Sequence, residues 1–209
     1  LRATSVISTA FHYGVKEIIP VQRLEEAKNY QGKENHIVAA ERNAMPIDGF
    51  DFGNSPFHYM NDKVKDKTLV LTTTNGTKAL EIAKNQICIT VSFINFDAVV
   101  KYLFSQEKDV VLLCSGWKGL FNLEDSVFAG KLAESLMQKG FQNSNDSTLA
   151  AIHLFKNVDT DLFSFRSMDN NDNLKLGYSG RIADTMDLDM INWLISHLPP
   201  KIEFHLAIG

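Results

Sequence analysis

The sequence predicts a three-layer α/β/α sandwich built on a mainly parallel or mixed sheet. Short, almost continuously apolar runs alternate along the chain with stretches of helical spacing. This alternation is typical of a sheet that helices cover on both faces. The chain has 209 residues, 44% of them hydrophobic and 22% charged, so it can bury a substantial core. We expect one domain over residues 1–209, or two intimately packed halves.

The first part of the chain begins with a helix and then alternates. Its elements are a helix over 5–13, a short apolar run over 15–21, a charged helix over 23–30 and a buried strand over 36–41. Thr4 or Ser5 is suited to cap the first helix. Because the sequence opens at what reads as a strand-to-helix junction, we expect that a preceding strand is missing here.

A long irregular loop is predicted over residues 42–56, where Gly, Asn, Asp and Pro are concentrated. Phe50 and Phe52 lie within it and favour an ordered loop. Loops of this length are usually functional or disordered, so an ordered one is a candidate part of a site.

The middle of the chain alternates more clearly. Its elements are strand 68–73, helix 77–84, strand 87–93, helix 97–104, strand 109–114 and a helix that follows Glu124. After Gly140 the pattern weakens, with a helix over 148–157 and a last strand within 192–204.

Composition excludes several classes of protein. The net charge is −4 with acids and bases mixed, and no basic run predicts nucleic-acid binding. Neither an apolar span of 18 residues nor a signal peptide is visible, so we expect no membrane partner. Cys88 and Cys114 both lie in apolar runs and read as reduced, buried thiols. We therefore expect a cytoplasmic protein.

One polar stretch follows the strand at 68–73, where parallel sheets bind their ligands. Within the stretch TTTNGT, the candidate ligand groups are the hydroxyls of Thr73, Thr74 and Thr77, the amide of Asn75 and the backbone at Gly76. The start of the next helix adds unpaired N–H groups and a partial positive charge. The stretch predicts either an ordinary capped helix or a site for a phosphate or sulfonate group.

A second loop and several acids also fall at strand ends. The segment SGWKGLFNLED contains Ser115, Gly116 and the cation Lys118, and it closes on two acids that suit a helix start. The candidate acids are Glu41, Asp51, Glu124 and Asp125. Because no His–Cys spacing accompanies them, they favour a hard cation such as Mg²⁺ over zinc. Anion-holding turns and Mg²⁺-type acids together point to phosphate chemistry.

Three segments in order give the chain a family resemblance. ERNAMPIDGFDFGNSP, TTTNGTKAL and SGWKGLFNLEDSVFAGKLAESL resemble the 2-phosphosulfolactate phosphatase family, as does LRATS at the front. The resemblance is strong over residues 1–140 and looser beyond. It implies a family-specific α/β topology, a homodimer and Mg²⁺-dependent hydrolysis of 2-phosphosulfolactate to 3-sulfolactate and inorganic phosphate. That reaction belongs to coenzyme M biosynthesis.

The resemblance also implies roles for individual residues. The catalytic residues are Arg2, Glu41, Asp51 and Asp125, and the Mg²⁺ ligands are Glu41, Asp51, Glu124 and Asp125. The substrate-binding residues are Arg42, Asn54, Thr73, Thr74, Asn75, Gly76, Thr77, Ser115 and Gly116. Arg2 would join Arg42 in holding the phosphate or the sulfonate.

Two alternatives stay open beside this interpretation. The stretch AERNA at 40–44 departs from the glycine-flanked sequence expected in the family, which leaves room for another phosphorylated hydroxy acid as substrate. A non-catalytic binder of anionic metabolites is the other alternative. Direct attack by water and a phosphoenzyme are both compatible with the sequence.

Overall fold

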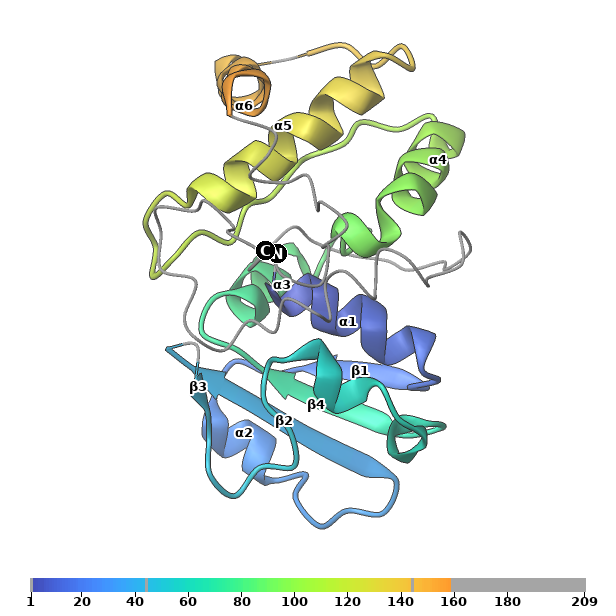
Figure 1. The fold of residues 1–209 in the computed structure, drawn as a ribbon, viewed down its shortest axis with the longest axis vertical. Helices are drawn as coiled ribbons and strands as arrows, with labels where there is room; N and C mark the ends of the chain where they lie inside the picture. Colours follow the sequence, from blue (N-terminus) through green and yellow to red (C-terminus); the bar gives the residue numbers. More distant parts are fainter. Residues whose placement is uncertain (1, 44, 144, 159–209) are drawn as a thin grey trace, which may run out of the picture.

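The computed structural model describes residues 2–43, 45–143 and 145–158, and its first half is an α/β sandwich (Figure 1). The helices and strands of this half are α1 (Arg2–His12), β1 (Glu17–Pro20), α2 (Leu24–Lys28), β2 (His36–Arg42), β3 (Met45–Pro46), β4 (Thr68–Thr72) and α3 (Gly76–Ala83). Two short 3-10 helices, Pro56–Tyr59 and Asp62–Val64, lie between β3 and β4.

The strand order in the sheet is β1-β4-β2-β3. Strand β4 pairs in parallel with β1 on one side and with β2 on the other, and only β3 runs antiparallel to its neighbour. The loop after β3 also follows β2, because Ala40 N donates to Phe52 O over 3.0 Å. The structure thus confirms the predicted α/β class with a mainly parallel, mixed sheet, and it shows the long loop ordered against the sheet.

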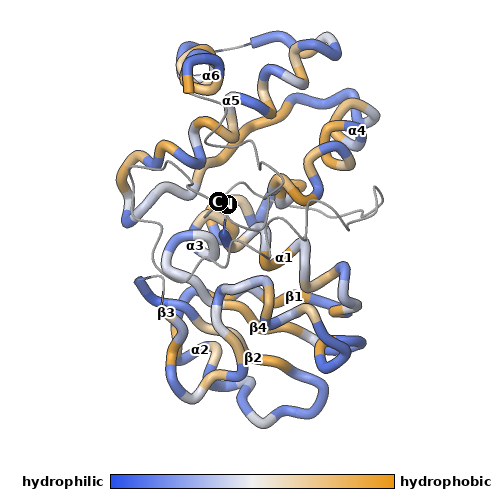
Figure 2. The backbone as a smooth tube through the Cα atoms, viewed as in Figure 1, coloured by the Kyte–Doolittle hydropathy of each residue, from blue (hydrophilic) through white to orange (hydrophobic). Residues whose placement is uncertain are grey.

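Helices cover both faces of this sheet, as a three-layer arrangement requires. Successive side chains of a strand point to opposite faces, and β4 uses this alternation fully. Leu69 and Leu71 pack in the core under α1, whereas Val70 packs with Ala27 of α2. Figure 2 shows the hydrophobic residues concentrated along the strands and hydrophilic residues in the outer loops.

The second half of the described chain consists of helices and extended segments around a separate core. Its helices are α4 (Phe96–Gln106), α5 (Leu123–Met137) and α6 (Asp146–Asn157), with a 3-10 turn at Phe93–Asn95. Phe128 of α5 is fully buried at the centre of this core. Gly130 lets α6 approach α5 closely, since a Cβ at that position would lie 2.0 Å from the carbonyl oxygen of Ala151.

Two predicted strands are absent from the described structure. Residues 87–92 and 109–114 form no helix or strand and pair with no strand among the described residues. Ile87 and Val111 are 71% and 89% exposed, unlike the residues of a buried strand. An apolar run specifies a buried side, but a strand also needs a hydrogen-bonding partner. The strand predicted within 192–204 lies outside the described residues.

The start of α1 also differs from the prediction. The helix already includes Arg2, so Thr4 and Ser5 lie within it and neither residue is its cap. The other helices begin and end within a few residues of their predicted limits.

The two halves meet at a buried polar contact. Ser8 Oγ of α1 lies 3.3 Å from Ser92 Oγ. Ser92 N donates to Asn95 Oδ1 over 2.8 Å, and Asn95 Nδ2 donates to the carbonyl oxygen of Thr90 over 2.9 Å. This small network joins α1 to the segment that leads into α4.

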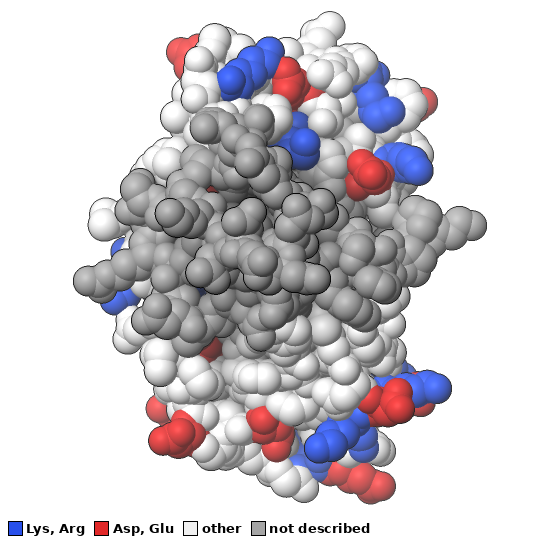
Figure 3. Space-filling view, viewed as in Figure 1, with Lys and Arg blue, Asp and Glu red and all other residues white. Residues whose placement is uncertain are grey.

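The described part of the surface carries charged side chains of both signs. Basic and acidic side chains lie interspersed on the face seen in Figure 3. Within the described part of the chain, no helix has the length and apolar character needed to cross a membrane.

Candidate functional site

The turn between β4 and α3 is held together by its own hydroxyl groups. Thr77 N donates to Thr73 Oγ1 over 3.2 Å, and Thr73 N donates to Thr77 Oγ1 over 3.3 Å. Thr77 Oγ1 also donates to the carbonyl oxygen of Thr73 over 3.0 Å. Both side chains are buried. These two threonines therefore fix the shape of the turn that leads into α3.

Thr74 connects this turn to the acid at the end of β2. Its hydroxyl donates to Glu41 Oε1 over 2.8 Å, and its backbone N–H donates to Glu41 Oε2 over 3.2 Å. The hydroxyl also accepts a hydrogen bond from Asn43 N over 3.0 Å. Glu41 is only 6% exposed. A buried carboxylate thus lies directly against the α3 N-terminus.

The backbone at this junction retains donors that the protein does not use. Within the described residues, the N–H groups of Asn75 and Gly76 have no protein acceptor. They open the first turn of α3, where N–H groups point away from the helix and attract anions. Gly76 also brings α1 close, since a Cβ there would lie 2.7 Å from Ala3 Cβ.

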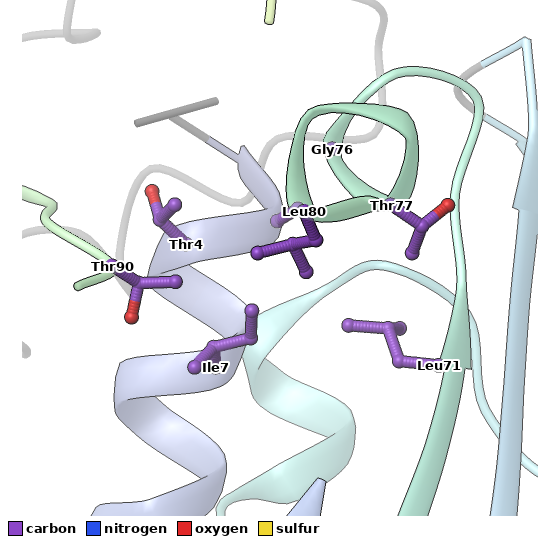
Figure 4. Close-up of a pocket in the computed structure, with 8 residues that line it drawn as sticks. Thr4, Ile7, Leu71, Gly76, Thr77, Leu80 and Thr90 are labelled. Atoms are coloured by element: carbon purple, nitrogen blue, oxygen red, sulfur yellow. The ribbon is translucent and has the colours of Figure 1, made fainter. Parts of the chain in front are cut away.

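A small cavity lies behind this junction, between α1 and α3. In Figure 4, Thr4 and Ile7 of α1 line it on one side and Gly76, Thr77 and Leu80 of α3 on the other. Its volume is about 10 Å³, at the limit for a single water molecule. The cavity is therefore too small to hold a phosphate group, whereas Asn75 and Gly76 at the start of α3 are half-buried.

The loop before α5 reaches the same junction. Lys118 N donates to Asn75 Oδ1 over 2.9 Å. This contact is made by a tight turn in which Trp117 and Leu120 exchange backbone hydrogen bonds and Lys118 and Gly119 both have positive φ. Positive φ at both central residues is typical of a two-residue hairpin turn, which favours glycine.

Asp125 organises the other end of this loop. It is 4% exposed, and its Oδ2 accepts from Gly116 N over 3.0 Å and from Ser115 Oγ over 3.4 Å. Asn122 caps α5 by accepting from Asp125 N over 3.0 Å. A second buried carboxylate therefore lies in the first turn of a second helix.

Burial and the nearby Asp125 carboxylate raise the pKa of the Cys114 thiol to about 11, so Cys114 is not a thiolate at neutral pH.

The structure does not bring the four predicted metal acids together. Asp51 is exposed and accepts from Val38 N over 2.8 Å, which places it three residues before Glu41, about 10 Å along the strand. Glu124 is half-buried in the first turn of α5. No three His, Cys, Asp or Glu side chains gather as a possible metal site in the described ranges.

The remaining predicted residues have varied surroundings. Arg2 is half-buried at the start of α1, beside Ala3. Asn54 has a buried Oδ1 with no hydrogen-bond partner in the described structure. Arg42 donates to three protein oxygens, in Glu41, Gln22 and Thr72.

Sequence reasoning missed two of the residues that build the site. Asn122 lies three positions before Asp125, and this common capping spacing could have revealed it. Thr72 gave no such signal, because its partners Arg42 and Gln22 are distant in sequence.

These features define an α/β protein with a polar site at the carboxyl edge of a parallel sheet, beside helix N-termini and two buried carboxylates. That location is typical of proteins that bind or transform small anions. The sequence model of the 2-phosphosulpholactate phosphatase family matches residues 1–196. The chain belongs to this family, which confirms the resemblance found in its three segments.

Individual relatives agree with the family match, and each carries the name probable 2-phosphosulfolactate phosphatase. The one from Caldanaerobacter subterraneus subsp. tengcongensis is 40% identical over 183 residues, which cover 85% of this chain and 72% of the relative. The relative from Thermotoga petrophila is 43% identical, and the match covers 76% of this chain and 68% of the relative. The relative from Clostridium novyi is 34% identical, and the match covers 97% of this chain and 88% of the relative.

Proposed function

We propose that this protein hydrolyses 2-phosphosulfolactate to 3-sulfolactate and inorganic phosphate with the help of Mg²⁺. Its family and the names of its relatives support the reaction. The observation that carries the proposal is the contact between Glu41 and Thr74, which sets a buried carboxylate beside the N–H groups of Asn75 and Gly76.

The phosphate is held at the start of α3. The N–H groups of Asn75 and Gly76 donate to its oxygens, and the positive end of the helix favours its charge. Arg2 supplies a cation from the neighbouring start of α1. A cation at a helix N-terminus is electrostatically unfavourable in isolation, so its position fits an anionic partner.

The two buried carboxylates suit Mg²⁺. Glu41 and Asp125 offer only hard oxygen donors, and Mg²⁺ commonly binds one or two carboxylates while keeping waters and phosphate oxygens. A bound Mg²⁺ would neutralise the phosphoryl oxygens and lower the pKa of a coordinated water. Glu41 and Asp125 would hold the ion and orient the attacking water. Hydrolysis then forms one P–O bond to water and breaks the ester P–O bond, so that the substrate oxygen leaves as a hydroxyl.

The test is release of inorganic phosphate by the purified protein. 2-Phosphosulfolactate is compared with a panel of phosphorylated hydroxy acids, each in the presence of Mg²⁺ and again with EDTA. We expect selective release that EDTA abolishes. Glu41→Gln should reduce turnover by about 100-fold, the lower range for a residue that acts in the chemical step. Glu34→Gln changes an exposed acid distant from the turn and should leave turnover unchanged.

Each outcome has a distinct meaning. Release of phosphate from another panel member alone would support phosphatase activity but show that 2-phosphosulfolactate is not the substrate. Full activity in EDTA would remove Mg²⁺ from the proposal. Detectable binding of phosphate without turnover of any panel member would overturn the proposed reaction.

A further inference from the structure

We infer that Arg42 is a positioning residue, which ties together the strand ends that carry the site rather than binding the substrate. The inference deepens the proposed function. Only the measurements of kcat and KM in its test rest on that function. Three hydrogen bonds define the role. Arg42 Nη1 donates to the carbonyl oxygen of Glu41 over 2.6 Å, and Nη2 donates to Gln22 O over 3.0 Å and to Thr72 Oγ1 over 2.9 Å.

These contacts cross the whole parallel part of the sheet. The strand order is β1-β4-β2, and Arg42 ends β2, Thr72 ends β4 and Gln22 follows β1. The network therefore links strand ends that lie two strand spacings, about 10 Å, apart. Thr72 Oγ1 closes the network by donating to Gln22 O over 3.3 Å. Arg42 thus holds three strand ends at the edge where parallel sheets place their ligands.

The chemistry of the side chain matches this role. A guanidinium presents several N–H donors in a fixed plane, so one head can serve acceptors in different directions, which the single ammonium of a lysine cannot do as well. Both N–H groups of Nη2 are committed to protein oxygens. Thr72 is fully buried. Turning the guanidinium toward a substrate would leave the buried Thr72 hydroxyl without its donor, a change that buried polar groups resist.

The network also lies next to the residues that the reaction uses. Arg42 bonds to the backbone of Glu41, whose carboxylate binds Thr74. Thr72 immediately precedes the turn that ends in the N–H groups of Asn75 and Gly76. Loosening the strand ends would therefore displace the Glu41 carboxylate, whereas the hydrogen bonds between Thr73 and Thr77 would still hold the turn that carries the phosphate donors. We expect loss of turnover with little loss of ground-state affinity.

The test compares Arg42→Met, Thr72→Val and their double variant with Arg23→Met. Arg23 is the matched control because it is an exposed arginine whose side-chain partner is Glu26. Thr72→Val removes the hydroxyl that Arg42 uses and keeps the arginine, so it tests the network even where Arg42→Met folds poorly. The measurements are kcat, KM, the Kd of inorganic phosphate, and amide hydrogen exchange.

The positioning role predicts a specific combination of results. Arg42→Met should lower kcat at least about 10-fold while KM and the phosphate Kd change less than about threefold. Amide exchange should accelerate at Val21 and at residues 72–75 in both single variants and stay unchanged at these positions in Arg23→Met. The double variant should be no worse than Arg42→Met alone, because both changes break one network.

Other results would overturn the inference. One is a rise of about 10-fold in KM and in the phosphate Kd of Arg42→Met with unaltered exchange at the strand ends. The other is additive effects of Arg42→Met and Thr72→Val. If the wild-type protein released no phosphate, the proposed reaction would fail, while exchange and phosphate binding would still decide the role of Arg42.

Discussion

The contact between the starts of α1 and α3 gives a sharp prediction for Gly76→Ala. The new Cβ would lie 2.7 Å from Ala3 Cβ and 3.1 Å from Thr73 Oγ1. Carbon atoms in contact are ordinarily about 3.5–4.0 Å apart, so the two helices must separate by roughly 1 Å. Overpacking of this kind costs about 1–3 kcal/mol, and alanine regains up to about 1 kcal/mol over glycine in a helix. We expect a net loss of about 1–2 kcal/mol in the free energy of unfolding.

A second substitution separates this steric cause from any other. Ala3→Gly removes the facing methyl group, and by itself it should cost about 1 kcal/mol through helix propensity. In the double variant the clash is gone, so the two changes should be non-additive by about 1–2 kcal/mol in favour of the pair. Urea unfolding followed by circular dichroism measures all four proteins. Strict additivity, or a Gly76→Ala variant as stable as wild type, would refute the close approach of the two helices.

Two further predictions concern the second half of the chain. Gly130→Ala would place a Cβ 2.0 Å from the backbone oxygen of Ala151, so α6 should shift from α5 at a cost of about 1–3 kcal/mol in thermal or urea unfolding. Ser135→Ala on the same helix should stay within about 0.5 kcal/mol, and equal stability of both variants would contradict the packing. The Cys114 thiol has a pKa of about 11 against an ordinary 9.0. Its proton therefore stabilises the fold below pH 9, and this contribution is lost between pH 9 and 11. Cys114→Ala should lose less stability over that interval, and an identical loss in both proteins would contradict the shift.

Much of the fold could be predicted because its signals are local. Apolar runs marked β2 and β4 closely, the polar stretch TTTNGT marked the start of α3, and helical spacing marked α5. Two other apolar runs, 87–93 and 109–114, were predicted as strands by the same rule and do not pair in the described structure. Strand pairing depends on a partner that is distant in sequence, and a run of apolar residues does not show whether such a partner exists.

The site was predictable in its location and less so in its details. The turn at 72–77 and the acids Glu41 and Asp125 lie at strand and helix ends, as a parallel sheet favours. A threonine hydroxyl can serve a ligand or its own backbone equally well, so sequence could not show that Thr73 and Thr77 bond to each other. Asp51 lies in a loop whose alignment along β2 is likewise invisible in sequence.

The polar contact between Ser8 and Ser92 has a consequence for synthesis of the chain. Residues 6–80 supply the two cores that flank the sheet, whereas residues 89–141 supply the core around Phe128. At translation rates of 5–20 residues per second, the second stretch takes roughly 3–12 s to emerge after the first. Mixed α/β units fold far faster than this. The α/β half can therefore form on the ribosome before residue 92 has emerged, and until then the hydroxyl of Ser8 lacks the partner that it has in the complete fold and must be satisfied by water.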